Sequence, residues 1–354
     1  MIGKTVGKKI GSERMSRKKI AVRILLLSLA IVIVACDRDN DPAPIKAQTQ
    51  PPAAVAAPAA SNLSLPPDTG PLPTFDPTRA MQYVKEIVAF GPRPLGSPNH
   101  KKVEDFIASH LKSDNVENDS FTADTPEGKF PARNIVAKFP GTKDGIILIA
   151  SHYDTNYPLR DTSYIGANDG GSSSALLLEI ANQLRGKKRE GYSVWLIWDD
   201  AEEAMKPESE LPFDKDSLYG IRHLAEKWQD DGTLKKVKAF LLADMIGDAD
   251  LNIDRDQNST PWLEEVVYQA ASRLGDQSHF FARDNQVTDD HVPFVQRGVP
   301  CADLIDFDYG YNNVFWHTPQ DTVDKLSPKS LDIVGRTLLE TINILDKMDP
   351  LPPK

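Results

Sequence analysis

The chain has 354 residues, enough for one large domain or two small ones, and 40% of them are hydrophobic, which allows a substantial core. The formal net charge at pH 7 is −10, which argues against a nucleic-acid-binding protein, because phosphate binding needs a basic face. The only cysteines, Cys36 and Cys301, lie far apart in the sequence and exclude a disulfide framework.

The N-terminal segment combines a basic region with a short apolar run. Lysine and arginine dominate residues 1–23, and residues 24–36 read ILLLSLAIVIVAC. A basic region before an apolar run is typical of an export signal. The run is shorter than the ~20 apolar residues of an ordinary membrane-spanning helix. Its end, IVAC, resembles the lipobox of bacterial lipoproteins, in which the cysteine is lipidated and becomes the mature N-terminus.

We therefore expect residues 1–36 to be a lipoprotein-type signal segment, with an uncleaved membrane anchor as the alternative. In either case the body of the protein lies outside the cytoplasm. It would be held at a membrane of a bacterial envelope, on the periplasmic or outer face, with lipidated Cys36 as the expected anchor. Residues 37–74 are rich in proline and alanine and have few large apolar residues, which predicts a disordered linker.

The remaining body, residues 75–350, alternates predicted helices with predicted strands. Apolar residues at helical spacing predict helices at 77–91, 99–113, 171–186, 216–229, 261–275 and 327–348. Apolar runs of strand length lie within 144–154, 192–203, 237–248 and 299–306. This alternation predicts a single α/β domain with three layers, helix, sheet and helix, around a mostly parallel mixed sheet.

Polar side chains follow each predicted strand where it ends. They are His152 and Asp154, residues 199–203, Asp244 and residues 303–308, and nearby loops add Asp169, Asp289, His291 and His317. In open sheets of this kind, ligands bind at the carboxyl ends of the strands. Buried carboxylates repel one another unless a cation compensates them. Imidazole and carboxylate ligands make Zn²⁺ the leading candidate for that cation.

The same motifs carry a resemblance to a known superfamily. The stretches SHYD, GAND, EE, LAD and WHTPQDT resemble those of the M28 zinc aminopeptidases. Within that superfamily, four stretches are similar to those of the glutaminyl-peptide cyclotransferases: FTADTPEGK, DSLYGIRHLA, LADMIG and DDHVPFVQRGVP. The resemblance covers roughly residues 92–345 and implies a zinc-aminopeptidase-like fold.

The resemblance also implies roles for individual residues. It implies one catalytic zinc bound by Asp169, Glu203 and His317, with one position left for substrate or water. It further implies that Glu202 is the general base and acid, that Asp244 and Asp289 are acids beside it, and that Trp316 is an aromatic wall of the substrate pocket. The implied reaction closes the N-terminal glutamine of a peptide or protein into pyroglutamate and releases ammonia.

A second chemistry stays open at this point. In the two-zinc aminopeptidases of the superfamily, the positions of His152 and Asp244 bind a second zinc, and Glu202 would then activate water to hydrolyse the first peptide bond. A tethered binding module on an inactive enzyme fold is a third possibility, disfavoured because Glu202 accompanies a complete ligand set. The aromatic residues Phe213, Tyr309 and Tyr311 are further candidates for the pocket.

Several residues also have ordinary structural interpretations. His152 could orient Asp169 rather than bind metal, and Asp289 could be a helix cap. His223 is expected to be structural or exposed, and Cys301 is expected to be a small buried residue of a strand.

Overall fold

The computed structural model describes residues 63, 65–66 and 69–352. The predicted signal segment, with Cys36, and most of the predicted linker lie outside these residues. The lipoprotein signal, the linker and the domain boundaries therefore stay predictions. Within the described part of the chain, no helix combines the length and the hydropathy needed to cross a membrane.

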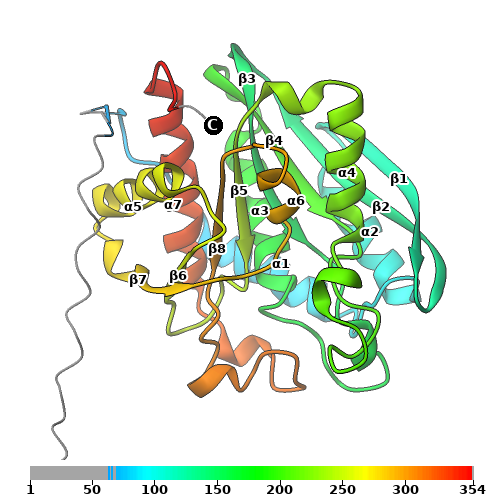
Figure 1. Cartoon of the computed structure of the whole chain (residues 1–354). Helices are drawn as coiled ribbons and strands as arrows, with labels where there is room; N and C mark the ends of the chain where they lie inside the picture. The colour runs from blue at the N-terminus through cyan, green and yellow to red at the C-terminus, as the bar shows by residue number, and fades with distance from the viewer. Residues whose placement is uncertain (1–62, 64, 67–68, 353–354) are drawn as a thin grey trace, which may run out of the picture. The chain divides into compact units, whose positions relative to one another are not determined.

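A six-stranded mixed sheet forms the centre of the domain (Figure 1). Its strands, in spatial order, are β1 (Asn115–Thr125), β2 (Gly128–Phe139), β4 (Arg189–Asp199), β3 (Gly141–His152), β5 (Val237–Asp244) and β8 (Cys301–Ile305). The pairs formed by β3, β4, β5 and β8 are parallel, whereas β1–β2 and β2–β4 are antiparallel. The predicted α/β fold with a mostly parallel mixed sheet is thereby confirmed.

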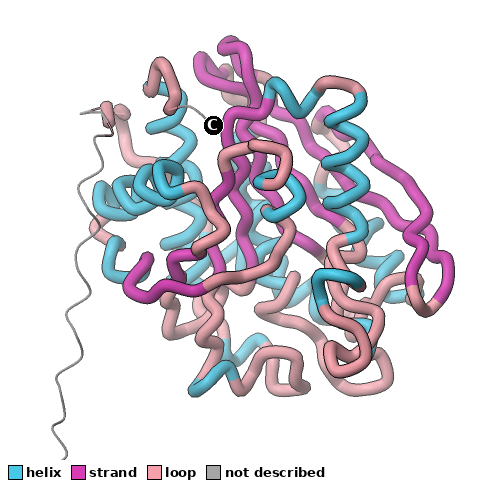
Figure 2. Tube along the Cα trace, viewed as in Figure 1, coloured by secondary structure: helices cyan, strands magenta, loops and turns pink. Residues whose placement is uncertain are grey.

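Helices cover both faces of this sheet (Figures 1 and 2). The helices are α1 (Pro77–Val88), α2 (Pro98–His110), α3 (Gly171–Leu184), α4 (Tyr219–Asp230), α5 (Pro261–Leu274), α6 (Val292–Val295) and α7 (Pro328–Lys347). One buried cluster joins α1, α2, α3, α5 and α7 to the sheet, and a second cluster joins α4 and α6 to its other face. The three predicted layers follow from these two clusters.

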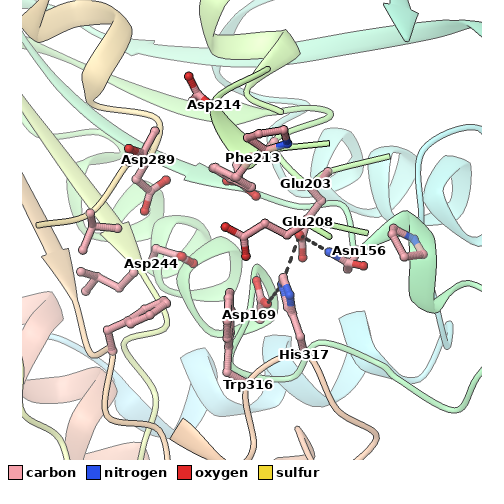
Figure 3. Close-up of a pocket in the computed structure, with 18 of the residues that line it drawn as sticks. Asn156, Asp169, Glu203, Glu208, Phe213, Asp214, Asp244, Asp289, Trp316 and His317 are labelled. Carbon is pink, nitrogen blue, oxygen red and sulfur yellow. Dashed lines mark hydrogen bonds and ion pairs between the residues drawn. The ribbon is translucent and has the colours of Figure 1, made fainter. Parts of the chain in front are cut away.

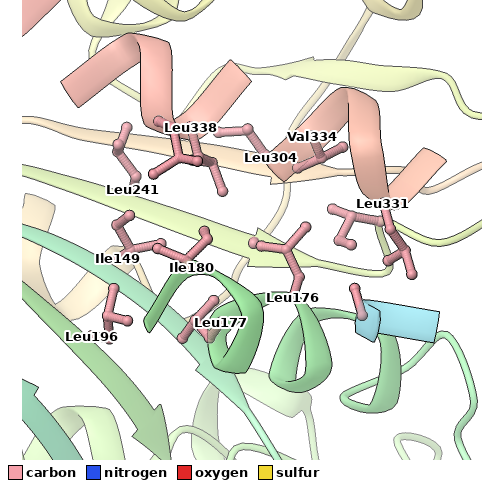
Figure 4. Close-up of a cluster of buried hydrophobic side chains, with 14 of the residues drawn as sticks. Ile149, Leu176, Leu177, Ile180, Leu196, Leu241, Leu304, Leu331, Val334 and Leu338 are labelled. Carbon is pink, nitrogen blue, oxygen red and sulfur yellow. The ribbon is translucent and has the colours of Figure 1, made fainter. Parts of the chain in front are cut away.

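In the larger cluster, α3 and α7 pack against the same face of the sheet (Figure 4). Leu176 and Ile180 of α3 lie beside Ile149 of β3, and Leu338 of α7 closes the same layer. All four side chains are buried. Burial of this kind stabilises the fold by about 25 cal/mol per Å² of apolar surface removed from water.

Local signals fix the helix ends. The side chains of Asp76, Ser97 and Ser327 accept backbone N–H groups at the starts of α1, α2 and α7, and a proline follows each of them. Gly275 ends α5 with φ of 81°, a conformation that glycine adopts without strain.

Two parts of the fold were not predicted from the sequence. The hairpin β1–β2 forms one edge of the sheet, and β6 (Ile253–Asp256) pairs with β7 (Phe280–Asn285) in a separate two-stranded sheet. Both carry many polar and charged side chains, so they lack the apolar runs that revealed the central strands.

The register of the parallel strands brings their carboxyl ends together. His152, the last residue of β3, pairs with Asp199, the last residue of β4. On the other side of β3, Asp244 ends β5 and pairs with Ile305, the last residue of β8. The polar segments that follow these strands therefore start from one edge of the sheet, where an open α/β sheet binds ligands.

Candidate active site

A cavity of about 520 Å³ opens at this edge of the sheet (Figure 3). It is lined by all the residues predicted for catalysis, substrate binding and the first metal site, namely Asp169, Glu202, Glu203, Asp244, Asp289, Trp316 and His317. His152 lies beneath it and is fully buried. The fold thus brings together residues that are up to 165 positions apart in the sequence.

Three side chains form a compact group at one end of the cavity. Asp169 precedes α3, Glu203 follows β4, and His317 lies in the loop after β8. The His317 Nε2 atom is 3.2 Å from Asp169 Oδ2 and 3.2 Å from Glu203 Oε2. Glu203 Oε1 is buried and has no hydrogen-bond partner among the described residues. One imidazole and two carboxylates, one with an unused oxygen, fit the ligand preferences of zinc.

His152 connects this group to a second one. Its Nε2 atom lies 3.2 Å from Asp169 Oδ1 and 3.2 Å from Asp244 Oδ1. These three side chains also meet the spacing of a metal site. The geometry therefore places His152 where it can orient Asp169 or share a second cation with Asp244.

Glu202 lies near both the candidate metal-ligand group, which is Asp169, Glu203 and His317, and a set of further carboxylates that includes Asp289. Burial raises the pKa of its carboxyl group well above the usual value, and the neighbouring Glu203 and Asp289 raise it further. His152 opposes this shift, with its Nδ1 atom 3.8 Å from Glu202 Oε2. A buried carboxyl group with a raised pKa binds a proton more readily than an exposed one, which suits a group that takes part in proton transfer.

Asp154 fixes the position of both glutamates. Its carboxylate accepts the backbone N–H groups of Glu202, at 3.2 Å, and Glu203, at 3.3 Å. The residue just before them, Ala201, has φ of 57°, which is rare for a residue other than glycine. Met245, after Asp244, and His317 share this left-handed conformation, with φ of 50° and 51°. Unusual backbone conformations of this kind gather at functional sites.

Asp289 lies on the cavity wall opposite the metal-ligand group (Figure 3). Its Oδ1 atom accepts the N–H of Asp290 at 2.6 Å, and its side chain makes no capping bond to α6. Burial and the charge of Asp244 raise the pKa of the Asp289 carboxyl group well above its usual value. The helix-cap interpretation therefore does not describe this side chain, which faces the cavity instead.

Sequence reasoning missed the side chains that hold the metal-ligand group in place. The hydroxyl of Tyr164 donates to Asp169 Oδ2 at 2.6 Å, and Asn156 Nδ2 donates to Glu203 Oε2 at 2.9 Å. The carboxylate of Asp321 accepts the backbone N–H groups of Asn168, at 2.8 Å, and Asp169, at 3.2 Å. Groups that bond to metal ligands fix their orientation and tune the metal.

Arg93 is a further missed residue, and its side chain is fully buried. Its guanidinium donates to the carbonyls of Tyr153, at 2.7 Å, Gly166, at 2.8 Å, and Asp169, at 3.0 Å, and also to that of Ile165. These carbonyls belong to the segments that present His152 and Asp169. The arginine lies in an irregular stretch before α2, where no periodic pattern marks it.

The aromatic lining differs in part from the prediction. Trp316 and Phe213 line the cavity, and Phe307, which was not predicted, joins them. The indole of Trp316 stacks on the His317 ring, with centroids 4.1 Å apart. Tyr309 and Tyr311 are not in the lining, because Tyr309 is buried with its hydroxyl on Asp321 and the side chain of Tyr311 is 86% exposed.

Two structural interpretations agree with the coordinates. The His223 ring stacks on Phe121 and its Nδ1 atom lies 3.0 Å from Asp119 Oδ2, away from the cavity. Cys301 is fully buried at the start of β8.

Comparison with known proteins identifies similar chains. Residues 134–342 match the model of peptidase family M28. A glutaminyl-peptide cyclotransferase-like protein of Mus musculus is 31% identical over 275 residues, which cover 70% of this chain and 70% of that protein. The crystal structure of an Acidobacteriales bacterium glutaminyl cyclase is 48% identical with a TM-score of 0.76, covering 80% of this chain and 99% of the other.

A peptidase is among the similar structures as well. The crystal structure of a Zn-dependent exopeptidase from Parabacteroides distasonis is 29% identical with a TM-score of 0.70. It covers 77% of this chain and 99% of the other. The fold is therefore common to proteins named for two different activities.

The hydroxyl of Tyr164 gives a test of the support around Asp169. We expect Tyr164→Phe to weaken metal affinity about tenfold, because Asp169 loses the donor that orients it. Zn²⁺ affinity would be measured by competition with a chelator, and the melting temperature would be measured in parallel. Tyr268→Phe, on α5, is the matched control and should bind Zn²⁺ as the unmodified protein does. Equal affinities in all three proteins would contradict the supporting role.

Proposed function

The chain belongs to the glutaminyl-peptide cyclotransferases of peptidase family M28, and from this premise we propose that it converts the N-terminal glutamine of peptides or proteins to pyroglutamate and releases ammonia. One observation carries the proposal for this site. The buried Glu202 carboxyl group faces the cavity beside the Asp169, Glu203 and His317 group, and no serine or cysteine is among the described residues that line it. This suits a reaction in which the substrate's own amine is the nucleophile.

Asp169, Glu203 and His317 are proposed to hold a single zinc ion. Bound there, zinc would supply Lewis acidity toward the side-chain amide carbonyl of the substrate. The unused oxygen of Glu203 and the absence of a competing lysine or arginine contact to these three carboxylate and imidazole groups, within the described chain, support this assignment.

Glu202 is proposed to move the proton that the reaction requires. The α-amine of the substrate attacks the side-chain amide carbon, and its proton passes to Glu202. The bond from that carbon to the amide nitrogen then breaks, and Glu202 returns the proton to the leaving ammonia. The raised pKa of the Glu202 carboxyl group favours the first half of this transfer, in which Glu202 takes the proton from the amine.

Asp244 and Asp289 are proposed to hold the substrate amine beside Glu202. Both line the cavity next to Glu202, and their carboxylates can accept hydrogen bonds from an ammonium or amine group. Trp316 is proposed as the wall against which the glutamine side chain lies, because its indole faces the cavity alongside His317.

The alternative activity is hydrolysis of the first peptide bond by an M28 aminopeptidase with two zinc ions. The observation that favours it is the second group, in which His152 lies 3.2 Å from both Asp169 and Asp244. In that case Glu202 would take the proton from a water molecule. The two activities use the same carboxylates and differ in the attacking group.

The site should distinguish two peptides that differ only at their first residue. We expect the full-length protein with zinc to convert a peptide beginning in glutamine to a product that has lost one ammonia with its chain intact. The corresponding leucine peptide should stay unchanged, since it has no side-chain amide. Mass spectrometry would measure both products, and release of a free N-terminal amino acid would overturn the cyclase proposal in favour of the peptidase.

Glu202→Gln is the informative variant in the same assay. It keeps the shape of the side chain but cannot accept the proton, so kcat should fall by about 10²- to 10⁴-fold. Zinc content should stay at the unmodified level, because Glu202 is not one of the proposed ligands. A variant that retains full activity would exclude Glu202 as the proton carrier.

Zinc content provides an independent test of the two activities. We expect one zinc ion per chain in the purified protein, lost in His317→Gln and retained in His152→Gln. Each variant removes one imidazole, that of His317 from the first group or that of His152 from the second. Comparing the two variants therefore shows which group holds zinc. Elemental analysis would give the ratio, and two zinc ions per chain with one left in His152→Gln would favour the aminopeptidase.

The protein is also proposed to work outside the cytoplasm, anchored to a bacterial membrane through lipidated Cys36. The basic region, the apolar run and the IVAC sequence of residues 1–36 support this placement.

A further inference from the structure

A second cavity, of about 450 Å³, adjoins the active-site cavity. It lies by α4 and α6, and we call it the outer groove, defined by Lys215, Leu218, Arg222, Glu226, Gln296 and Arg297. Asp214 and Thr288 line both cavities. A peptide whose first residue occupies the active-site cavity therefore has a path over these two residues into the outer groove.

The two cavities differ in charge. The active-site cavity is lined by acidic side chains, Asp169, Glu202, Glu203, Glu208, Asp214, Asp244 and Asp289, with Lys206 as its only lysine or arginine. This lining attracts a substrate amine and repels a substrate carboxylate. The outer groove instead carries three basic side chains, Lys215, Arg222 and Arg297, against the acids Asp214 and Glu226.

The two arginines of the outer groove keep their charge available. Arg222 NH2 donates to the carbonyl of Asp214 at 2.8 Å, and Arg297 donates to Gln229 Oε1 and to the carbonyl of Pro293, both at 2.8 Å. These acceptors are neutral, and within the described chain neither guanidinium forms an ion pair with a carboxylate. Lys215 differs, because it already pairs with Asp214 at 2.6 Å.

These contacts hold the arginines without neutralising them. Each guanidinium has five N–H donors, of which Arg222 uses one and Arg297 uses two in the bonds above. The remaining donors suit a carboxylate, which arginine binds in a planar, two-pronged geometry.

We propose that the outer groove binds a carboxylate of the substrate peptide downstream of its N-terminal glutamine, with Arg222 and Arg297 as the residues that determine this preference. The inference rests on the proposed function. The carboxylate is that of an acidic side chain or of the peptide's own C-terminus. An extended chain advances about 3.3–3.6 Å per residue, so the preferred position should be one specific residue after the glutamine.

The test compares short peptides that begin in glutamine and are otherwise alanine. The reference peptide has an amidated C-terminus. In the others, a single glutamate or a single lysine replaces the alanine at position 2, 3, 4 or 5, or the C-terminus is a free acid. We expect the best glutamate peptide to exceed its lysine counterpart about fivefold in kcat/KM, through KM, and the ratio to shrink at 0.5 M salt, roughly as for exposed ion pairs.

Variants of the outer-groove residues test whether the preference for glutamate over lysine arises there. The double variant Arg222→Gln, Arg297→Gln should bring the glutamate-to-lysine ratio close to one, and Arg297→Glu should invert it. Glu226→Gln should raise the ratio, because it removes the acid that opposes the substrate carboxylate. Lys347 is an exposed lysine at the C-terminal end of α7. Lys347→Gln removes one positive charge outside the groove and should leave the ratio unchanged.

The outcomes separate this inference from the proposed function. If the reference peptide does not lose ammonia, the proposed function fails. If it reacts and the glutamate and lysine peptides react equally, only the groove proposal is overturned. A preference that survives in the double variant also overturns it. A gain at one internal position identifies an acidic side chain as the ligand, whereas a gain only with the free C-terminus identifies the terminal carboxylate.

Discussion

Buried negative charge must be compensated by positive charge or by protonation. This requirement governs the arrangement of side chains at the carboxyl ends of the parallel strands. Asp169, Glu202, Glu203, Asp244 and Asp289 come from segments after different strands and meet around one cavity. His152 offsets part of their charge from beneath, where it contacts Asp169 and Asp244. The rest is shared between raised pKa values, as in Glu202 and Asp289, and the capacity of the site to bind a cation. The same arrangement of carboxylates suits both the metal ion and the proton carrier that we propose for this site.

The central strands could be predicted because burial on both faces leaves a clear mark in the sequence. Residues 146–150 and 237–244 are almost wholly apolar, as strands covered by helices on both faces must be. The hairpin β1–β2 escaped prediction because its edge position exposes much of it to solvent, so polar side chains interrupt the pattern. The short strands β6 and β7 were missed because polar side chains interrupt their apolar residues. Asp254, Arg255 and Asp256 follow Ile253 in β6, and β7 ends in Arg283, Asp284 and Asn285.

In the candidate site, too, some residues could be predicted from the sequence and others could not. Its acidic side chains could be predicted because they follow buried strands, where a charge run is unexpected. Arg93, Tyr164 and Asn156 could not, because each lies in an irregular segment without a periodic pattern. Arg93 and Asn156 also act through contacts with residues far along the chain, Asp169 and Glu203. Phe307 replaced Tyr309 and Tyr311 as a pocket aromatic because the loop after β8 turns Tyr309 inward onto Asp321.

The position of Arg93 bears on where the functional unit begins. The family match starts at residue 134, yet the guanidinium that holds the carbonyls of Tyr153, Gly166 and Asp169 enters from 41 residues earlier in the chain. The strand β1 and the helices α1 and α2 also precede the matched range and are packed onto it. A fragment that began at residue 134 would keep every proposed metal ligand. It would lose Arg93, whose guanidinium holds the segments that present His152 and Asp169. A domain boundary taken from the matched family range alone would therefore be too short for this protein.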